Sequence, residues 1–592
     1  MSEPSPSIPY MNSSLTSQAI ILSALALGLS VGSISAQQVA EGGGWYAKVQ
    51  QKSSHHISLP GASISGANDV FISSDINNDG YSDYIAAGIF EEPATGARSA
   101  RIYVISGLTG EIMFIKENRG PDYGSRLEVI IAGDINSDGF PDILIGAPTA
   151  SANGRNRCGL AALVSGSTGE IIKIWYGQTA GAEFGASIAG VDDVDRNGFR
   201  DVIIGAPGTR LPSQQHVGAA YVFSGSWNGD PNFGQSLYTF TGVDAHSGFG
   251  RRVAAADDVN RDGYPDILIS APGYDSTLGR GYPGTVDVFS GLDGSPMAHF
   301  QGRRRSQHFG FSIAGVGDID RDGYPDIAIG HPAFQSDPVL RRGGVIVYSG
   351  LTNRVIRHYQ SHEMGDGFGI KIAPTGDTNG DFWPAVFIGA PDAEGGRGSA
   401  TLISGENDAV LFRAVGDDTT SHLGRSLHAS GSLNRYGFVD LLILSSSPTL
   451  GSIISRYVFI DGLEMPRGDN VSSSAPTRVA LKVDMPRDMA GQVYQILVTI
   501  NGLDPWQTNQ GIQIPLADSS LLHRSAQNNL PGFFRGNIGF LDPVGNANAT
   551  IDFPAGHLSS IVGSSIHFSA IVYDSNGYVE ASTVAKELHV NY

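Results

Sequence analysis

The sequence contains a single cysteine, Cys158, in 592 residues, so the chain cannot form an internal disulfide. Charged residues make up only 16% of the chain, and the net charge of −20 argues against a nucleic-acid backbone as the partner. Neither a nucleophile elbow, an HExxH motif nor the His/Cys spacing of a zinc site is present. These absences favour a non-enzymatic protein held together by core packing or by bound metal.

Basic residues are also missing from the first 47 positions. Residues 19–31 (AIILSALALGLSV) form an apolar run that is too short for a membrane-spanning helix, and small residues follow it. We therefore expect residues 1–36 to be a signal peptide, no transmembrane segment, and a secreted or cell-surface protein. The alternative is a disordered leader.

The sequence is in contrast rich in glycine, with 78 residues. Few long helical patterns occur, and short apolar runs alternate with Gly and Pro, which is typical of many short strands and tight turns. The length favours two domains.

One stretch, residues 318–326 (DIDRDGYPD), joins two short apolar runs. Carboxylates occupy its positions one, three, five and nine, and a glycine occupies position six. This alternation directs the acidic side chains toward one centre, and hard oxygen ligands of this kind suit calcium. The alternative is an Asp-rich turn that uses its carboxylates for local hydrogen bonds.

The same loop recurs along the chain at intervals of about 60 residues. The five intact loops begin at Asp75, Asp134, Asp193, Asp258 and Asp318. In each, we expect the side chains of positions one, three, five and nine and the backbone carbonyl of position seven to bind calcium. The predicted ligands are Asp75, Asn77, Asp79, Tyr81, Asp83, Asp134, Asn136, Asp138, Phe140, Asp142, Asp193, Asp195, Asn197, Phe199, Asp201, Asp258, Asn260, Asp262, Tyr264, Asp266, Asp318, Asp320, Asp322, Tyr324 and Asp326.

Two further loops are altered. The sixth, residues 377–385, has Phe382 in place of the glycine and Ala385 at position nine, which leaves its metal binding open. The seventh, residues 432–440, has Ser432 and Tyr436 at ligand positions and is expected to bind no metal.

Each of the first six repeats contains four short apolar runs, and a four-stranded sheet cannot bury both of its faces alone. We therefore expect seven sheets to stack radially as a seven-bladed β-propeller over residues 37–465, with a linear β-solenoid as the alternative. The seventh repeat lacks a fourth strand. Residues 45–58 precede the first repeat and are predicted to supply that outer strand and close the ring.

The second to sixth repeats also carry a Phe-Gly pair or a close variant before the acidic loop, and a Gly-Ala-Pro triplet or a close variant after it. Examples are Phe184-Gly185 with Gly205-Ala206-Pro207 and Phe368-Gly369 with Gly389-Ala390-Pro391. These units resemble FG-GAP repeats, from which the seven-bladed propeller of integrin alpha chains is built. The resemblance covers roughly residues 45–465. It implies a monomeric calcium-binding propeller, and the chain differs from an integrin in lacking a transmembrane helix and long leg domains.

Alternating strand directions place the acidic loops and the Ser-Gly turns between the third and fourth strands on one face. The longer, more varied connections lie on the other face, where a rigid scaffold usually carries its binding site. Six arginines on these connections form a possible ligand surface for carboxylate or sulfate groups, with a solvated charge run as the alternative. They are Arg280, Arg303, Arg304, Arg305, Arg341 and Arg342.

After residue 465 the repeats stop. Residues 466–476 are predicted to be a linker, and the alternating runs of residues 477–592 predict an immunoglobulin-like β-sandwich. Taken together, the sequence predicts a calcium-stabilised extracellular binding or adhesion scaffold for a protein or glycan. Two alternatives remain open: a polysaccharide hydrolase or lyase that uses the loop face or the central channel, and a structural surface-layer component.

Overall fold

The computed structural model describes residues 49–50, most of residues 67–459 and the strands of residues 463–591. The stretches of five or more residues outside this description are residues 1–48, 51–66, 92–97, 119–126, 211–215, 227–232, 274–282, 333–341, 431–439, 465–469, 485–490, 500–505, 508–512, 515–533, 554–564 and 574–578. The predicted signal peptide therefore lies outside the described residues. Within the described part of the chain, no helix combines the length and the apolar composition needed to cross a membrane.

The chain divides into two compact units, one spanning Ala36–Asp461 and the other including Gly462–Tyr592. In the described residues of the first unit, the strands form seven four-stranded antiparallel sheets. Six of these sheets consist of consecutive strands, and the seventh combines β26, β27 and β28 with β1. The all-β class and the repeated four-stranded antiparallel sheets predicted from the sequence are confirmed.

The first three sheets are β2(Ala67–Ile72), β3(Tyr84–Glu91), β4(Arg98–Ile105) and β5(Ile112–Asn118); β6(Glu128–Gly133), β7(Asp142–Ala147), β8(Leu160–Val164) and β9(Ile171–Tyr176); and β10(Ser187–Val191), β11(Asp201–Ala206), β12(Ala219–Phe223) and β13(Ser236–Thr241). The next two are β14(Arg252–Ala255), β15(Ile267–Ala271), β16(Thr285–Phe289) and β17(Pro296–Gln301); and β18(Ser312–Gly317), β19(Asp326–His331), β20(Gly344–Tyr348) and β21(Val355–Gln360). The last two are β22(Lys371–Asp377), β23(Pro384–Ala390), β24(Ser399–Ser404) and β25(Val410–Val415); and β26(Ser426–Ser430), β27(Asp440–Ser447), β28(Gly451–Phe459) and β1(Val49–Gln50). The short turn α1(Ala393–Gly396) follows β23.

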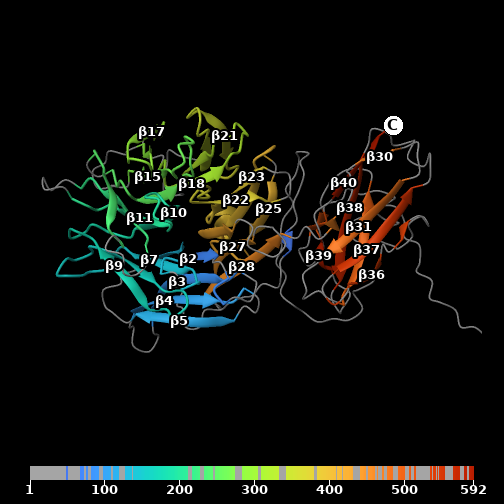
Figure 1. Ribbon diagram of the computed structural model, residues 1–592, viewed down its shortest axis with the longest axis horizontal. Coiled ribbons are helices and arrows are strands. Elements are labelled where there is room, and N and C mark those ends of the chain that lie inside the picture. Colours follow the sequence, from blue (N-terminus) through green and yellow to red (C-terminus); the bar gives the residue numbers. More distant parts are fainter. Residues whose placement is uncertain are drawn as a thin grey trace, which may run out of the picture. The chain divides into compact units, whose positions relative to one another are not determined.

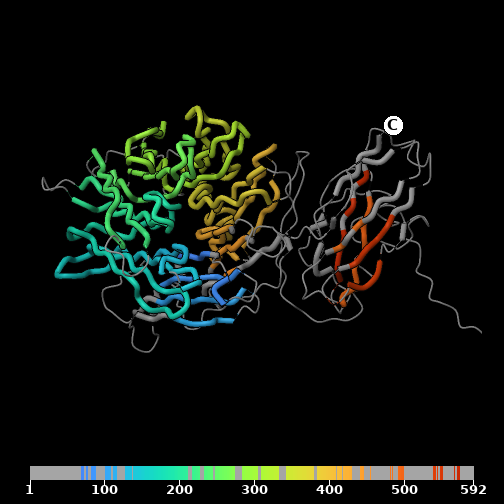
Figure 2. Tube along the Cα trace, viewed as in Figure 1, coloured from blue at the N-terminus to red at the C-terminus, as the bar shows by residue number. Residues whose placement is uncertain are grey.

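The core of this unit lies between neighbouring sheets. For example, Leu144 of β7 and Ala161 of β8 share a buried cluster with Ile204 of β11, which belongs to the next sheet. Both faces of each sheet are thereby covered, which explains why the second strands β7, β11 and β19 are buried along their whole length. Figure 1 shows the sheets following one another around a centre, and the trace in Figure 2 follows the same path.

The first and last sheets are in contact. Strand β2 lies against β26 and β27, and Val70 and Tyr103 share a buried cluster with Leu442 and Leu444. The short strand β1 pairs with β28 on the outer side of the last sheet, with Val49 opposite Phe459. This is the position at which the sequence leaves a fourth strand missing. The arrangement is that of a β-propeller.

The glycines of the Phe-Gly and Gly-Ala-Pro motifs meet at the boundary between two sheets. A Cβ added at Gly205 would lie 2.0 Å from the backbone oxygen of Gly250 in the next sheet. Gly250 itself has a φ of 84°, in the left-handed region that favours glycine. The two motifs therefore keep adjacent sheets in direct backbone contact, which no larger residue allows.

The C-terminal unit contains a four-stranded sheet and a six-stranded sheet. One has the order β29-β31-β37-β35, and the other has the order β30-β40-β38-β32-β36, with β39 paired to β38. Their strands are β29(Leu463–Glu464), β30(Asn470–Ser472), β31(Thr477–Asp484), β32(Val493–Thr499), β35(Phe534–Arg535), β36(Ile538–Phe540), β37(Asn546–Phe553), β38(Ser565–Tyr573), β39(Val579–Ser582) and β40(Lys586–Asn591), and a separate pair is formed by β33(Trp506–Gln507) and β34(Gln513–Ile514).

Part of the expected linker is therefore strand. Within residues 466–476, Asn470–Ser472 form β30 and pair in parallel with β40. The sequence does not predict this strand, because a run of three residues among Ser, Asn and Pro is too short to show an alternating pattern. Its partner strand also lies more than a hundred residues away.

Candidate metal sites and the opposite face

Each acidic loop connects the first and second strands of a sheet, and its first aspartate shapes the turn. In the third loop, Oδ1 of Asp193 accepts a hydrogen bond from the backbone of Asn197 at 2.9 Å, and Oδ2 accepts one from Gly198 at 2.6 Å. The second and fourth loops repeat both bonds, and the fifth repeats the bond from its glycine. The local bonding expected of an Asp-rich turn is thus present, and it curls the loop around its own acidic side chains.

The aspartate at position nine lies at or immediately before the start of the second strand and is fully buried. In the third loop, Oδ2 of Asp201 accepts the backbone N–H of Val194 at 2.8 Å, and Oδ1 accepts that of Gly225 at 2.7 Å. Gly225 belongs to the Ser-Gly turn that follows the third strand. All five intact loops repeat this pair of bonds. Position nine therefore fastens the acidic loop to the neighbouring turn, on the same face of the unit.

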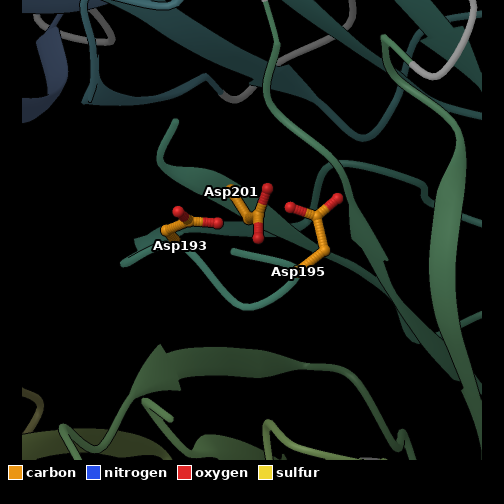
Figure 3. A group of neighbouring side chains, drawn as sticks. All are labelled: Asp193, Asp195 and Asp201. Carbon is orange, nitrogen blue, oxygen red and sulfur yellow. The ribbon is translucent and has the colours of Figure 1, made fainter. Parts of the chain in front are cut away.

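Carboxylates gather in two of the loops closely enough to hold one ion. Oxygens of Asp193, Asp195 and Asp201 lie within 4.8 Å of one another, as do oxygens of the equivalent fifth-loop residues Asp318, Asp320 and Asp326. Figure 3 shows the three carboxyl groups of the third loop facing a common space. The second and fourth loops carry Asn136 and Asn260 at position three, so they have an amide oxygen where the third and fifth loops have a carboxylate.

Burial changes the acidity of the position-nine carboxyls. It raises the pKa of Asp142 to about 6 and those of Asp201, Asp266 and Asp326 to about 7, although hydrogen bonds from backbone N–H groups oppose the rise. Nearby aspartates of the same loops raise these pKa values further. Negative charge is therefore costly at this point in the metal-free loop, and a divalent cation offsets that cost.

One oxygen in the fifth loop has no hydrogen bond. Among the described residues, Oδ1 of Asp318 is buried without a partner. Buried carboxylate oxygens are normally satisfied, and this one belongs to the cluster of three carboxylates. An all-oxygen donor set with an unsatisfied anionic oxygen fits a calcium ion. Asp318, Asp320 and Asp326 would hold it, and the ion would supply charge neutralisation.

Serines of the Ser-Gly turns also reach the acidic loops, which the sequence reasoning did not predict. The hydroxyl of Ser224 donates to Asp195 at 2.7 Å, that of Ser165 donates to Asp138 at 3.2 Å, and that of Ser349 donates to Asp322 at 3.1 Å. The signal available in the sequence was the recurrence of Ser-Gly at the end of the third strand. These donors orient the carboxylates at positions three and five.

Some predicted sites are only partly described. In the first loop Asp75, Asn77 and Asp83 are described, whereas Asp79 and Tyr81 lie outside the described residues. Asn379 to Phe382 of the sixth loop and residues 431–439, which include most of the seventh, also lie outside.

The predicted arginine surface is likewise only partly described. Arg303 and Arg342 are exposed, and Arg280, Arg304, Arg305 and Arg341 lie outside the described residues. The positive charge of Arg303 helps to lower the pKa of His358, after the larger effect of burial. Arg303 is thus near the outer strand β21.

At the start of the first strands, polar side chains from different sheets meet. Nη1 of Arg252 on β14 lies 2.5 Å from Oε1 of Glu128 on β6, two sheets away. Nζ of Lys371 on β22 lies 3.5 Å from Oδ1 of Asp69 on β2, which also accepts the hydroxyl of Ser426 at 2.6 Å. These ion pairs occupy the end of the first strands that lies away from the acidic loops.

Comparisons with known proteins match the same segments. The FG-GAP repeat family matches residues 184–223, 249–289 and 309–348, and the FG-GAP-like repeat family matches residues 75–145. Integrin alpha-5 of Xenopus laevis is 29% identical over 233 residues, which cover 37% of this chain and 21% of that protein. Integrin alpha-6 of Homo sapiens is 36% identical over 177 residues, covering 28% and 14%.

A third relative is named as an enzyme. Phosphatidylinositol-glycan-specific phospholipase D of Bos taurus is 32% identical over 223 residues, covering 32% of this chain and 25% of that protein. The aligned segments thus span between about a seventh and a quarter of these relatives. The matches, the repeated four-stranded sheets and the contacts between the motif glycines lead to one conclusion. Residues 75–145, 184–223, 249–289 and 309–348 match FG-GAP and FG-GAP-like repeats, and the chain is similar over part of its length to integrin alpha chains.

Proposed function

We propose that this protein is an extracellular binding scaffold in which calcium bound to the acidic loops stabilises a closed seven-bladed propeller. The observation that carries the proposal is the convergence of three carboxylates within 4.8 Å in the third and fifth loops. Metal bound there would join the acidic loop, the start of the second strand and the Ser-Gly turn. The position-nine aspartate already contacts both its own loop and that turn. Calcium is therefore structural in this proposal.

The ligand surface is proposed on the face opposite the acidic loops. Arg303 and Arg342 are exposed there, on connections whose length and sequence vary from repeat to repeat. Exposed guanidinium groups bind carboxylate and sulfate groups bidentately, so the partner is proposed to be an acidic protein segment or an acidic glycan. The ion pairs of Glu128 with Arg252 and of Asp69 with Lys371 occupy the axial end of this face, which favours the surrounding loops over the channel as the binding surface.

A binding screen with the full chain tests this proposal. Immobilised extracellular-matrix proteins and sulfated or uronic glycans would be probed in calcium and in chelator. We expect saturable binding that the double substitution Arg303→Ala and Arg342→Ala weakens at least tenfold. Arg200→Ala is the matched control, because Arg200 is an exposed arginine in the third acidic loop, paired with Asp192. Equal loss in the control, or turnover of a polysaccharide, would overturn the proposed binding role.

A further inference from the structure

We propose that Arg196, Arg261 and Arg321 are positioning residues for the acidic loops of the following sheets. Each lies at position four of one loop and contacts the aromatic residue at position seven of the next. The inference rests on the proposed function, since the loops that these arginines contact include proposed calcium sites. These contacts keep the receiving loop in its metal-binding shape when no metal is bound.

The contacts recur at similar distances. Cζ of Arg196 lies 3.9 Å from the centre of the Tyr264 ring, and Cζ of Arg261 lies 4.8 Å from that of Tyr324. Cζ of Arg321 lies 4.1 Å from the centre of the Trp383 ring. Guanidinium groups at these distances are attracted to the ring face. Three consecutive boundaries between sheets thus carry one arginine–aromatic contact each.

The contacted residue is next to the turn of the receiving loop. Nη2 of Arg196 donates a hydrogen bond to the backbone oxygen of Gly263 at 3.2 Å, one residue before Tyr264. A Cβ added at Gly323 would lie 2.9 Å from Nη2 of Arg261. The arginine therefore lies against positions six and seven together. Position seven is the residue whose carbonyl is expected to bind the metal, so fixing it places a ligand.

The second and third loops differ in this respect. Among the described atoms, none lies within 4 Å of a Cβ added at Gly139 or Gly198, their position-six glycines. The loops that precede them carry Asn78 and Ser137 at position four in place of arginine. The chain thus contains two kinds of acidic loop, with and without an arginine from the preceding sheet.

The backbone of these arginines is also unusual. Arg196, Arg261 and Arg321 have φ values of 58°, 58° and 57°. This left-handed conformation is unfavourable for a long side chain and favours glycine or asparagine. The contact with the next loop offsets that cost at each of the three positions.

Charge explains why the effect belongs to the metal-free loop. Asp258, Asp262 and Asp266 repel one another when no cation is bound, and the guanidinium of Arg196 reduces this repulsion. The same positive charge repels an incoming cation, so the contact orders the loop in advance and does not increase the attraction for metal. In the sixth loop, which has lost Gly at position six and Asp at position nine, the Arg321–Trp383 contact stabilises a loop with few metal ligands.

Hydrogen exchange of the full chain, followed by mass spectrometry, tests the inference. In chelator, we expect amides of residues 258–266 and 318–326 to exchange more slowly than those of residues 134–142 and 193–201. Arg196→Ala should accelerate exchange in residues 258–266 about two- to fivefold, the factor that corresponds to one exposed cation–π contact. Arg261→Ala should do the same in residues 318–326. Arg200→Ala, in the same loop as Arg196, should leave residues 258–266 unchanged.

The outcomes separate this inference from the proposed function. If Arg196→Ala accelerates only its own loop, residues 193–201, or neither loop, the positioning role is wrong. If the two arginine variants behave as expected while added calcium protects none of the loops, the positioning role stands and the calcium sites are wrong. If calcium slows hydrogen exchange in the loops but neither arginine variant changes exchange in chelator, the calcium sites stand and the positioning role is wrong.

Discussion

At the scale of single residues, the position-nine aspartate has two roles. Asp201 accepts backbone N–H groups from Val194 and Gly225, and it also lies in the cluster with Asp193 and Asp195. A carboxylate oxygen has two lone pairs, so both roles are compatible. The adjacent Asp195 is exposed and accepts its bonds from Asn197 and Ser224. Comparing substitutions of Asp201 and Asp195 therefore distinguishes the structural role of a loop carboxylate from its role in metal binding.

Asp201→Ala should destabilise the first unit even without calcium. It leaves two buried N–H groups without an acceptor, at a cost of about 1–3 kcal/mol each. Asp195→Ala should cost less than about 1 kcal/mol in chelator, because Asp195 is exposed and the hydroxyl of Ser224 also has the backbone oxygen of Gly225 as an acceptor. Urea unfolding in chelator measures both values. Equal costs for the two variants would mean that position nine has no special structural role.

His428 predicts a pH dependence. Burial lowers its pKa to about 3, and its ring lies 3.7 Å from that of Phe71, where the last sheet meets the first. The unfolded chain binds a proton at this residue from about pH 6.5 downward, whereas the folded chain does not. The stability that neutral His428 supports is therefore present above pH 6.5 and is lost as the pH falls toward 3, by up to about 1.4 kcal/mol per pH unit.

This dependence can be isolated by substitution. The free energy of unfolding of the natural chain, measured in chelator at pH 7.5 and pH 5, should fall more steeply than that of His428→Phe. The carboxyl groups titrate in both proteins and cancel in the comparison. A slope that is the same in both proteins would show that His428 is protonated in the folded state.

At the scale of elements, contacts between sheets repeat at several radii. Near the outer edge, Nε1 of Trp175 on β9 donates to the backbone of Gly234, and the hydroxyl of Tyr238 on β13 donates to that of Gly291. Further in, the motif glycines meet backbone to backbone. These two sheets are thus fixed to their following neighbours by their fourth strands as well as by the core.

The pair of Glu128 and Arg252 joins sheets that are not neighbours. Both side chains are largely buried, with 11% and 19% exposure. We expect Glu128→Gln and Arg252→Met each to cost about 1–3 kcal/mol, and the double substitution to cost less than the sum, because a lone buried charge is the main penalty. Urea unfolding of the four proteins gives the coupling energy. Additive costs would indicate that the pair is solvated and contributes nothing.

The sequence predicted much of this architecture because it repeats. Seven copies of one pattern established the strand order in each sheet, and alternating strand directions placed the acidic loops beside the Ser-Gly turns, as the bond from Gly225 to Asp201 shows. Apart from the pairing of β1 with the last sheet, which the missing fourth strand indicated, the sequence did not predict nonlocal contacts. Arg196 and Tyr264 are 68 positions apart, and nothing in either loop identifies the other as its partner. The strand at Asn470–Ser472 was missed for the same reason.

At the scale of the whole molecule, the two units differ in their expected response to metal. The acidic loops all belong to the unit of Ala36–Asp461, and the predicted sites do not extend into residues 462–592. A cation that binds only the folded loops stabilises that unit by mass action. Calcium should therefore act on one unfolding transition and leave the other unchanged.

Differential scanning calorimetry of the full chain, in excess calcium and in chelator, tests this account most directly. We expect the transition of the first unit to occur at least about 5 °C lower in chelator, and that of the C-terminal unit to stay in place. Asp195→Ala and Asp320→Ala should each reduce the difference. If chelator leaves both transitions where they are, or lowers both equally, the acidic loops are not structural calcium sites.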